Sequence, residues 1–329
     1  MKRVALIFTG GTISMQVDPV AGGNVPALDG TAILARAPGI QSIADLRIID
    51  LGRTPASHFG FDQLFAIAAA IRSALDDPAT DGVVVVQGTD VLEETAFFWD
   101  LLLDDPRPIV VTGAMRSASM ADDDGPENLR AAVRCAASAA LRDQGVLVCL
   151  DHTVHAADDV TKTHASALDT FQSLNDGPVA RITGYEIEVL RRRGRRRHVS
   201  AARAAGHIPL VTAHVAMDGS LIEALAATEL DGLVVEATGA GNTDARLLAA
   251  AEPLMANGIP VVLATRCAAG AASTGYAFPG GGATWVRAGA ILPGHLSGPK
   301  ARIALALGIG AGLGRADLVS LLADPGDMP

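Results

Sequence analysis

Cysteine and aromatic residues are scarce in this sequence of 329 residues. The three cysteines, Cys135, Cys149 and Cys267, are odd in number, lie far apart and form no CxxC pair, so neither a disulfide framework nor a thiolate zinc site is expected. Aromatic residues make up only 4% of the chain, and its formal net charge is −10, which repels phosphate backbones. We therefore expect a protein of a reducing compartment that does not bind nucleic acid.

Long apolar runs are absent as well. The apolar run at the N-terminus, Val4–Phe8, is shorter than the roughly 7–15 residues of a signal-peptide core. The uncharged stretch Cys267–Val286 is interrupted by glycine and proline, so it lacks the ~18 consecutive apolar residues of a spanning helix. We expect a cytoplasmic protein that does not associate with membranes.

What the sequence does contain is an alternation of short apolar runs with segments of helical length. Apolar residues make up 49% of the chain, which is enough to bury a substantial core, and the length suggests two domains. Runs with apolar residues at consecutive positions are typical of strands buried on both faces. In the first half of the chain these runs lie at 4–8, 47–50, 82–87, 108–112 and 145–150. The helical segments between them are 62–75, 90–103 and 127–141.

This alternation predicts an α/β fold with a doubly wound, mostly parallel sheet. The pattern breaks near 181–207, which includes the arginine-rich run RRRGRRR at 191–197, and it resumes with strands at 208–212, 232–237 and 259–265. We expect a larger N-terminal catalytic domain over 1–190, a linker over 191–207 and a smaller C-terminal α/β domain over 208–329. In an acidic chain the arginine run is interpreted as a solvent-exposed linker or hairpin tip rather than a contact for nucleic acid.

Hydroxyl groups and one carboxylate follow the predicted strands. TGGTIS (9–14) follows the first strand, Ser57 and His58 the second, Gly88-Thr89-Asp90 the third, and 112–115 the fourth. Ligands of open α/β sheets bind at the carboxyl ends of the strands, so these groups are expected to share one pocket. The alternative is that they are helix caps, with Asp90 capping the helix that follows.

Lysine is the third scarce residue. Only Lys2, Lys162 and Lys300 occur among 26 basic residues, and Lys162 lies in DDVTKTHAS (158–166), far from both ends. Arginine cannot deprotonate in a protein, whereas a partly buried lysine can act as a base. A threonine hydroxyl needs such a base to become a nucleophile. Thr89, Lys162 and Asp90 therefore form a candidate catalytic set, with a surface lysine as the alternative.

Other chemistries have weaker support. The sequence contains no GxGxxG, no P-loop GK[ST] and no GxSxG elbow. Asp151, His152, His155, Asp158 and Asp159 superficially resemble a metal cluster, but their spacing matches no known ligand motif. No metal and no cofactor are expected.

The motifs at the strand ends resemble those of the bacterial-type L-asparaginase family. They are TGGTIS (9–14), VVQGTDVLEETAFFWDLLL (85–103), PIVVTGAMR (108–116), DDDGPENL (122–129) and DDVTKTHASALDTFQS (158–173), in the family's order and spacing. The resemblance implies a two-step hydrolysis of the side-chain amide of L-asparagine without a cofactor. It also implies a homodimer or homotetramer with active sites at a subunit interface.

Matching motif by motif, the resemblance implies that Thr12 is the nucleophile, on a mobile loop. It assigns Thr89, Lys162 and Asp90 to a second set that activates water or threonine, with backbone groups around Thr89 stabilising the oxyanion. It implies that Asp90 binds the α-ammonium group of the substrate and Ser57 its α-carboxylate. It also implies that Ala114 lies on the leaving-group side and that Asn242 reaches the substrate of a neighbouring subunit.

The sequence departs from the family at three places. No tyrosine occurs between Thr12 and Ser57, where the family carries one on the flexible loop. The family's C-terminal glutamate is replaced by the glycine-rich segment 275–285, and we hypothesise that Tyr276 supplies the missing phenol from a neighbouring subunit. His58 stands where many members carry glutamine, which affects the choice of substrate side chain.

Three functions remain open at this point. The first is an L-asparaginase with minor glutaminase activity. The second is the glutaminase component of a tRNA-dependent amidotransferase, which requires a partner chain. The third is a catalytically idle amino-acid sensor that retains the pocket.

Overall fold

The apolar runs form the centre of an eight-stranded sheet, in a computed structural model that describes residues 1–324. By its internal contacts the chain divides into two units, Met1–Arg196 and a second unit that begins at Arg197. The sheet lies in the first unit, with the strand order β12-β11-β8-β7-β6-β5-β1-β4. Its strands are β1 (Arg3–Phe8), β4 (Asp45–Asp50), β5 (Gly82–Val86), β6 (Ile109–Thr112), β7 (Val146–Leu150), β8 (Thr153–Ala156), β11 (Ala180–Thr183) and β12 (Glu186–Val189).

Strands β4, β1, β5, β6 and β7 pair in parallel, as the alternation predicted. Strands β8, β11 and β12 extend the sheet with antiparallel pairs, and the sequence patterns did not reveal them. Strand β4 is the outer strand of the parallel part, and its residues are exposed or half-buried. The expectation that the run at 47–50 is buried on both faces is therefore wrong, because the helices that enclose the central strands leave this edge of the sheet partly open.

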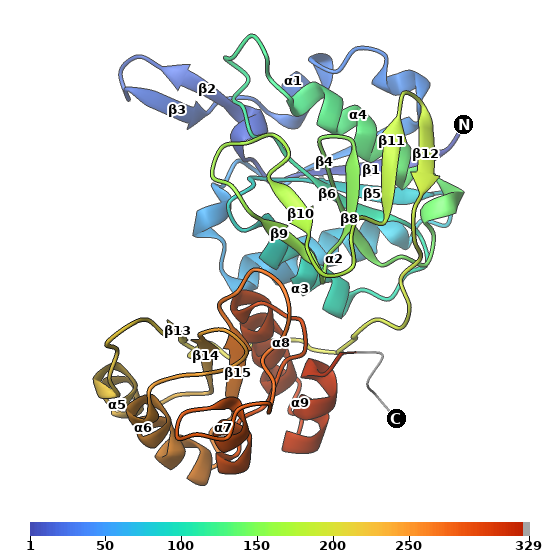
Figure 1. Ribbon diagram of the computed structural model, residues 1–329. Coiled ribbons are helices and arrows are strands. Elements are labelled where there is room, and N and C mark those ends of the chain that lie inside the picture. Colours follow the sequence, from blue (N-terminus) through green and yellow to red (C-terminus); the bar gives the residue numbers. More distant parts are fainter. Residues whose placement is uncertain (325–329) are drawn as a thin grey trace. The chain divides into compact units, whose positions relative to one another are not determined.

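Four helices cover the two faces of the sheet, and they are α1 (Gly30–Ala35), α2 (Phe61–Leu75), α3 (Leu92–Leu102) and α4 (Gly125–Ala136). Val4, Leu6 and Phe8 of β1 pack in one core with residues of α1 and α4, while α2 and α3 lie on the other face (Figure 1). This arrangement on both faces confirms the doubly wound fold.

Helix α3 begins, and helix α4 ends, at a different residue from the one that the sequence predicted, and in each case the reason is local. Helix α3 begins at Leu92 with Val91 at its N-cap and no capping side chain, so Asp90 does not cap it. Helix α4 ends at Ala136, before the predicted end, because Ser138 caps the separate short helix η4 (Ala139–Leu141). Three further short helical turns are η1 (Thr12–Ser14), η2 (Ile40–Ser42) and η3 (Ala56–His58).

Two small hairpins complete the first unit. They are formed by β2 (Met15–Asp18) with β3 (Gly23–Pro26) and by β9 (Val160–Lys162) with β10 (Phe171–Ser173). The first hairpin occupies the predicted mobile loop after Thr12.

The second unit is a three-stranded parallel sheet with helices. Its strands, β13 (Leu210–Thr212), β14 (Leu233–Ala237) and β15 (Val261–Thr265), lie in chain order and match the three predicted runs. Its helices are α5 (Ser220–Ala226), α6 (Ala245–Ala256), α7 (Gly282–Ala288), α8 (Gly298–Gly310) and α9 (Arg315–Leu322). No helix within residues 1–324 combines the length and apolar character that crossing a membrane requires.

The arginine run is only partly exposed to solvent, with Arg192 and Arg195 exposed and two other members enclosed. Residues 191–196 of the predicted linker belong to the first unit, and those from Arg197 onward belong to the second. The side chains of Arg193 and Arg197 are only 4% and 5% exposed, because both guanidinium groups are paired with carboxylates. The sequence could not show this, because the partners of these charges lie far away along the chain.

Candidate active site

The turns after β1 and β5 touch each other through glycine. A methyl group built on Gly11 would lie 2.1 Å from the backbone nitrogen of Gly88, and Gly11 has a φ of +96°. Only a residue without a side chain allows this approach. Because these glycines immediately precede Thr12 and Thr89, the contact brings both threonines to the same edge of the sheet.

Two more turns join at the same place. A methyl group on Gly88 would lie 3.0 Å from the Cβ atom of Ala56, the residue before Ser57. One on Gly113, the residue before Ala114, would lie 3.2 Å from the Cγ2 atom of Thr89. The four segments predicted to line one pocket therefore converge in the first unit.

Lys162 and Thr89 form the polar centre of this site. Lys162 Nζ lies 2.9 Å from Thr89 Oγ1 and 3.6 Å from Asp90 Oδ1. The Lys162 side chain is 15% exposed and Thr89 is 4% exposed, whereas the Asp90 side chain is 67% exposed. The structure thus joins the three residues that the sequence proposed as one set. Lys162 is not a surface lysine.

The β9–β10 hairpin positions this lysine. Lys162 is the last residue of β9 and pairs with Phe171, which is buried. At the other end of β9, Asp159 accepts hydrogen bonds from the backbone N–H groups of Asn175 and Asp176. Contacts at both ends of β9 therefore fix the backbone that carries Lys162.

Thr12 begins the short helix η1 and is half-buried. The turn is closed by Ser14, whose backbone N–H and hydroxyl both donate to the carbonyl of Gly11, at 2.9 and 2.7 Å. The hairpin that follows is attached to the rest of the unit where Val17 N donates to Ser119 Oγ at 3.0 Å.

The remaining predicted residues of the first unit differ in burial. Ser57 and His58 are exposed on η3, and Ala114 is fully buried. Exposed polar side chains beside a buried threonine suit recognition of the charged end of a small molecule.

Asp124 and Asn128 hold the turn after β6, and the sequence alone had assigned no role to either residue. Asp124 accepts hydrogen bonds from the backbone N–H groups of Met115 and Arg116 and from the Asn128 side chain. Asn128, which is 3% exposed, also donates to the carbonyl of Gly113 at 3.1 Å. An aspartate just before the predicted helix 127–141, followed four residues later by an asparagine within it, is the signal that could have indicated this pair.

Asn242 and Tyr276 lie in the second unit. Asn242 follows β14, where its carbonyl accepts from the backbone N–H of Thr238, and it lines a cavity of about 380 Å³ together with Arg266 and Phe278. Tyr276 is 49% exposed, and its ring lies edge-on to Phe278 with the centroids 6.0 Å apart.

The histidines and aspartates at 151–159 do not act as a group. Asp151 and His152 form an exposed turn with positive φ, whereas His155 is buried and bonded to Ser173. No group of three potential metal ligands occurs within residues 1–324.

Comparison with known protein families finds matches along nearly the whole chain. Residues 3–195 match the family model described as "Asparaginase, N-terminal". Residues 207–322 match the model described as "Glutaminase/Asparaginase C-terminal domain".

Individual relatives agree with these matches. A probable L-asparaginase of Deinococcus radiodurans is 35% identical over 323 residues, covering 97% of this chain and 96% of the relative. A subunit of the glutamyl-tRNA(Gln) amidotransferase of Aeropyrum pernix is 30% identical, but the match covers only 65% of that longer protein and 80% of this chain. The crystal structure of a probable cytoplasmic L-asparaginase from Campylobacter jejuni has a TM-score of 0.87 at 24% identity, covering 98% of this chain and 99% of that one.

Proposed function

This chain belongs to the asparaginase family and is an amidohydrolase, and on that premise we propose that it hydrolyses the side-chain amide of L-asparagine to L-aspartate and ammonia. The observation that carries the proposal is the contact of 2.9 Å between Lys162 Nζ and Thr89 Oγ1, with Asp90 beside the same amine. A hydroxyl in contact with an enclosed amine is the arrangement that a threonine-dependent hydrolase requires.

In this proposal Lys162 takes and returns a proton. As a neutral amine it accepts the proton of the Thr89 hydroxyl, and as an ammonium ion it donates back to the oxygen and is stabilised by Asp90. The low exposure of Lys162 and Thr89 strengthens these interactions, because little water competes for them. Through Thr89 the set activates either Thr12 or the attacking water.

Thr12 is the proposed nucleophile. Its oxygen attacks the amide carbon of asparagine, and the C–N bond breaks as the nitrogen takes a proton and leaves as ammonia. The resulting ester is cleaved by water, which supplies the hydroxyl of the new carboxyl group and returns a proton to Thr12. Within residues 1–324 the backbone N–H groups of Thr89 and Asp90 donate no hydrogen bond, so both are available to a developing oxyanion.

The proposed recognition of substrate uses the exposed side of the site. A zwitterionic amino acid needs a carboxylate for its ammonium group and a hydroxyl donor for its carboxylate. Asp90 and Ser57 supply these groups, and both are accessible at the surface. In the proposal His58 faces the side chain of the substrate, and the turn at the buried Ala114 lies on the leaving-group side.

The proposal includes self-association into a dimer or tetramer. Asn242 and Tyr276 of a neighbouring copy then reach the site, and the Tyr276 phenol replaces the tyrosine that is missing from the loop after Thr12. The partly exposed Tyr276 ring is compatible with this role. We further propose a cytoplasmic location, which is the location given for the similar protein of Campylobacter jejuni.

The direct test is ammonia release by the purified protein from L-asparagine, D-asparagine and L-glutamine. An L-asparaginase releases ammonia from L-asparagine fastest, and Thr12→Ala abolishes the reaction while Thr12→Ser retains part of it. The absence of ammonia from all three compounds would refute the proposal.

The same assay distinguishes the two alternatives. An idle sensor binds L-asparagine in a calorimeter without releasing ammonia. An amidotransferase component releases little ammonia from L-glutamine without its partner chain.

A further inference from the structure

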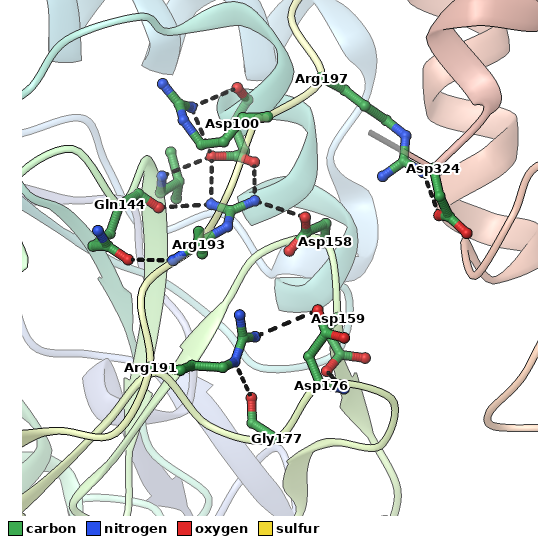
Figure 2. Close-up of polar contacts among 12 residues, drawn as sticks. Asp100, Gln144, Asp158, Asp159, Asp176, Gly177, Arg191, Arg193, Arg197 and Asp324 are labelled. Carbon is green, nitrogen blue, oxygen red and sulfur yellow. Dashed lines mark hydrogen bonds and ion pairs between the residues drawn. The ribbon is translucent and has the colours of Figure 1, made fainter. Parts of the chain in front are cut away.

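The arginine run forms a buried ion-pair cluster that the proposed chemistry does not use. Arg193 is bound to Asp100 through two hydrogen bonds of 3.1 and 2.8 Å, and the same guanidinium lies 2.8 Å from Asp158 (Figure 2). It also donates to the carbonyl of Gln144 at 2.7 Å. The side chains of Arg193 and Asp100 are 4% and 2% exposed, so the pair is almost fully enclosed.

The cluster is organised around this one arginine. Burial by itself would lower the pKa of Arg193, but the charges of Asp100 and Asp158 outweigh burial and raise the pKa. Arg196 contacts the same Asp100 carboxylate at 3.1 Å and reaches outward to Asp104, whose side chain is 76% exposed. Arg193 is therefore the inner member of the cluster, and Asp104 is its outer edge.

Arg193 joins the two segments that carry the catalytic set. Asp100 lies near the end of α3, the helix that follows Thr89 and Asp90. Asp158 lies four residues before Lys162, in the turn that leads into β9. The two segments thus meet twice, at the contact between Thr89 and Lys162 and at the Arg193 ion pairs.

Both junctions lie a short way apart along each segment. Asp158 is four residues from Lys162, and the chain between them spans at most about 13 Å. On the other segment Thr89 precedes the start of α3 by three residues, and eight helical steps of about 12 Å in total lead from Leu92 to Asp100. The ion pairs and the catalytic contact therefore close a ring in which the Asp158 arm is short, so a shift of this segment at Arg193 also moves the backbone that carries Lys162.

We infer that the Arg193–Asp158 ion pair is a positioning device that holds β9 at the distance where Lys162 Nζ meets Thr89 Oγ1. This inference rests on the proposed function of Lys162. A lysine side chain is long and flexible, so the placement of its backbone decides how often the amine occupies the productive position. A displacement of about 1 Å at a catalytic group costs up to about a hundredfold in rate.

The test uses three variants of the full chain. Asp158→Ala removes the ion pair, Asp158→Asn keeps the shape and one acceptor oxygen, and Asp104→Ala removes a carboxylate of the same cluster that does not touch the Lys162 segment. With L-asparagine, Asp158→Ala is expected to lower kcat about tenfold with KM within about twofold, because the substrate contacts stay in place. Asp158→Asn is expected to recover most of that loss, and Asp104→Ala to remain within about twofold of the wild type.

A double-mutant cycle separates positioning from general destabilisation. In a Lys162→Met background, Asp158→Ala is expected to cause no further loss of residual activity, because no amine is left to position. An equal loss in both backgrounds would overturn the inference, and so would an unchanged kcat in folded Asp158→Ala. If Asp158→Ala does not fold, Asp158→Ser, which keeps a small polar side chain but removes the carboxylate, takes its place in the cycle with the same criterion. Wild-type protein that releases no ammonia from L-asparagine refutes the proposed function instead.

Discussion

Replacing Lys162 by arginine and by methionine tests the proposed chemistry most directly. Arginine retains the positive charge beside Asp90 but cannot give up its proton, whereas methionine removes both charge and base. If Lys162 transfers a proton to and from Thr89, both variants lose general-base catalysis. The expected loss in kcat is about 10²–10⁴-fold for each.

The same two substitutions of Lys162 are expected to change the stability of the fold much less than they change kcat. The Lys162–Asp90 pair is 3.6 Å long with an Asp90 side chain that is 67% exposed, so it contributes only about 0–1 kcal/mol. The hydrogen bond to Thr89 adds about 1 kcal/mol. For a unit of this size, such a loss lowers Tm by only about 2–8 °C.

The assay measures ammonia release at saturating L-asparagine, and thermal unfolding by circular dichroism confirms that the variants are folded. Lys2→Arg is the matched control, because Lys2 is a surface residue paired with Asp81 and its substitution leaves the site untouched. A Lys162→Arg enzyme that keeps more than about a tenth of the wild-type kcat would show that Lys162 acts only through its charge, and the proton-transfer role would be refuted.

Three further substitutions test the geometry of the site. Gly11→Ala places a methyl group 2.1 Å from the Gly88 nitrogen and should lower activity at least about a hundredfold. In the control Gly22→Ala, which also has a positive φ but has no atom within 4 Å of the new methyl group, activity in the same assay should stay near wild type. Asn128→Ala leaves the Gly113 carbonyl without its partner, so the expected destabilisation is about 1–3 kcal/mol with a higher KM; an unchanged denaturation midpoint would contradict this role. Tyr276→Phe should lower kcat about tenfold if the phenol of a neighbouring copy assists proton transfer, and equal turnover of variant and wild type would exclude that assistance.

Much of the parallel sheet could be predicted from the sequence. A strand buried on both faces needs apolar side chains at consecutive positions, and β1, β5, β6 and β7 show this pattern without interruption. The run at 47–50 has the same appearance but forms an edge strand, because its number of neighbours is set by strand order and not by its own residues.

The candidate site was predictable in residue type but not in arrangement. Lys162 could be identified because lysine is rare in a chain that otherwise uses arginine, and the resemblance of its motif pointed the same way. Its contact with Thr89 joins residues 73 positions apart, and only the packing of β9 against α3 produces it.

The arginine run is the clearest case in which local sequence does not predict whether a charged side chain is buried or exposed. By itself RRRGRRR determines a concentration of positive charge, which ordinarily belongs in solvent. A charged side chain is buried only where an opposite charge lies beside it in space. The partner of Arg193 is Asp100, which is 93 positions away along the chain. The sequence therefore determined the parallel strands, the reactive residue types and the family. The tertiary structure alone decided which charges are paired and enclosed, because electrostatic attraction and desolvation act between neighbours in space rather than in sequence.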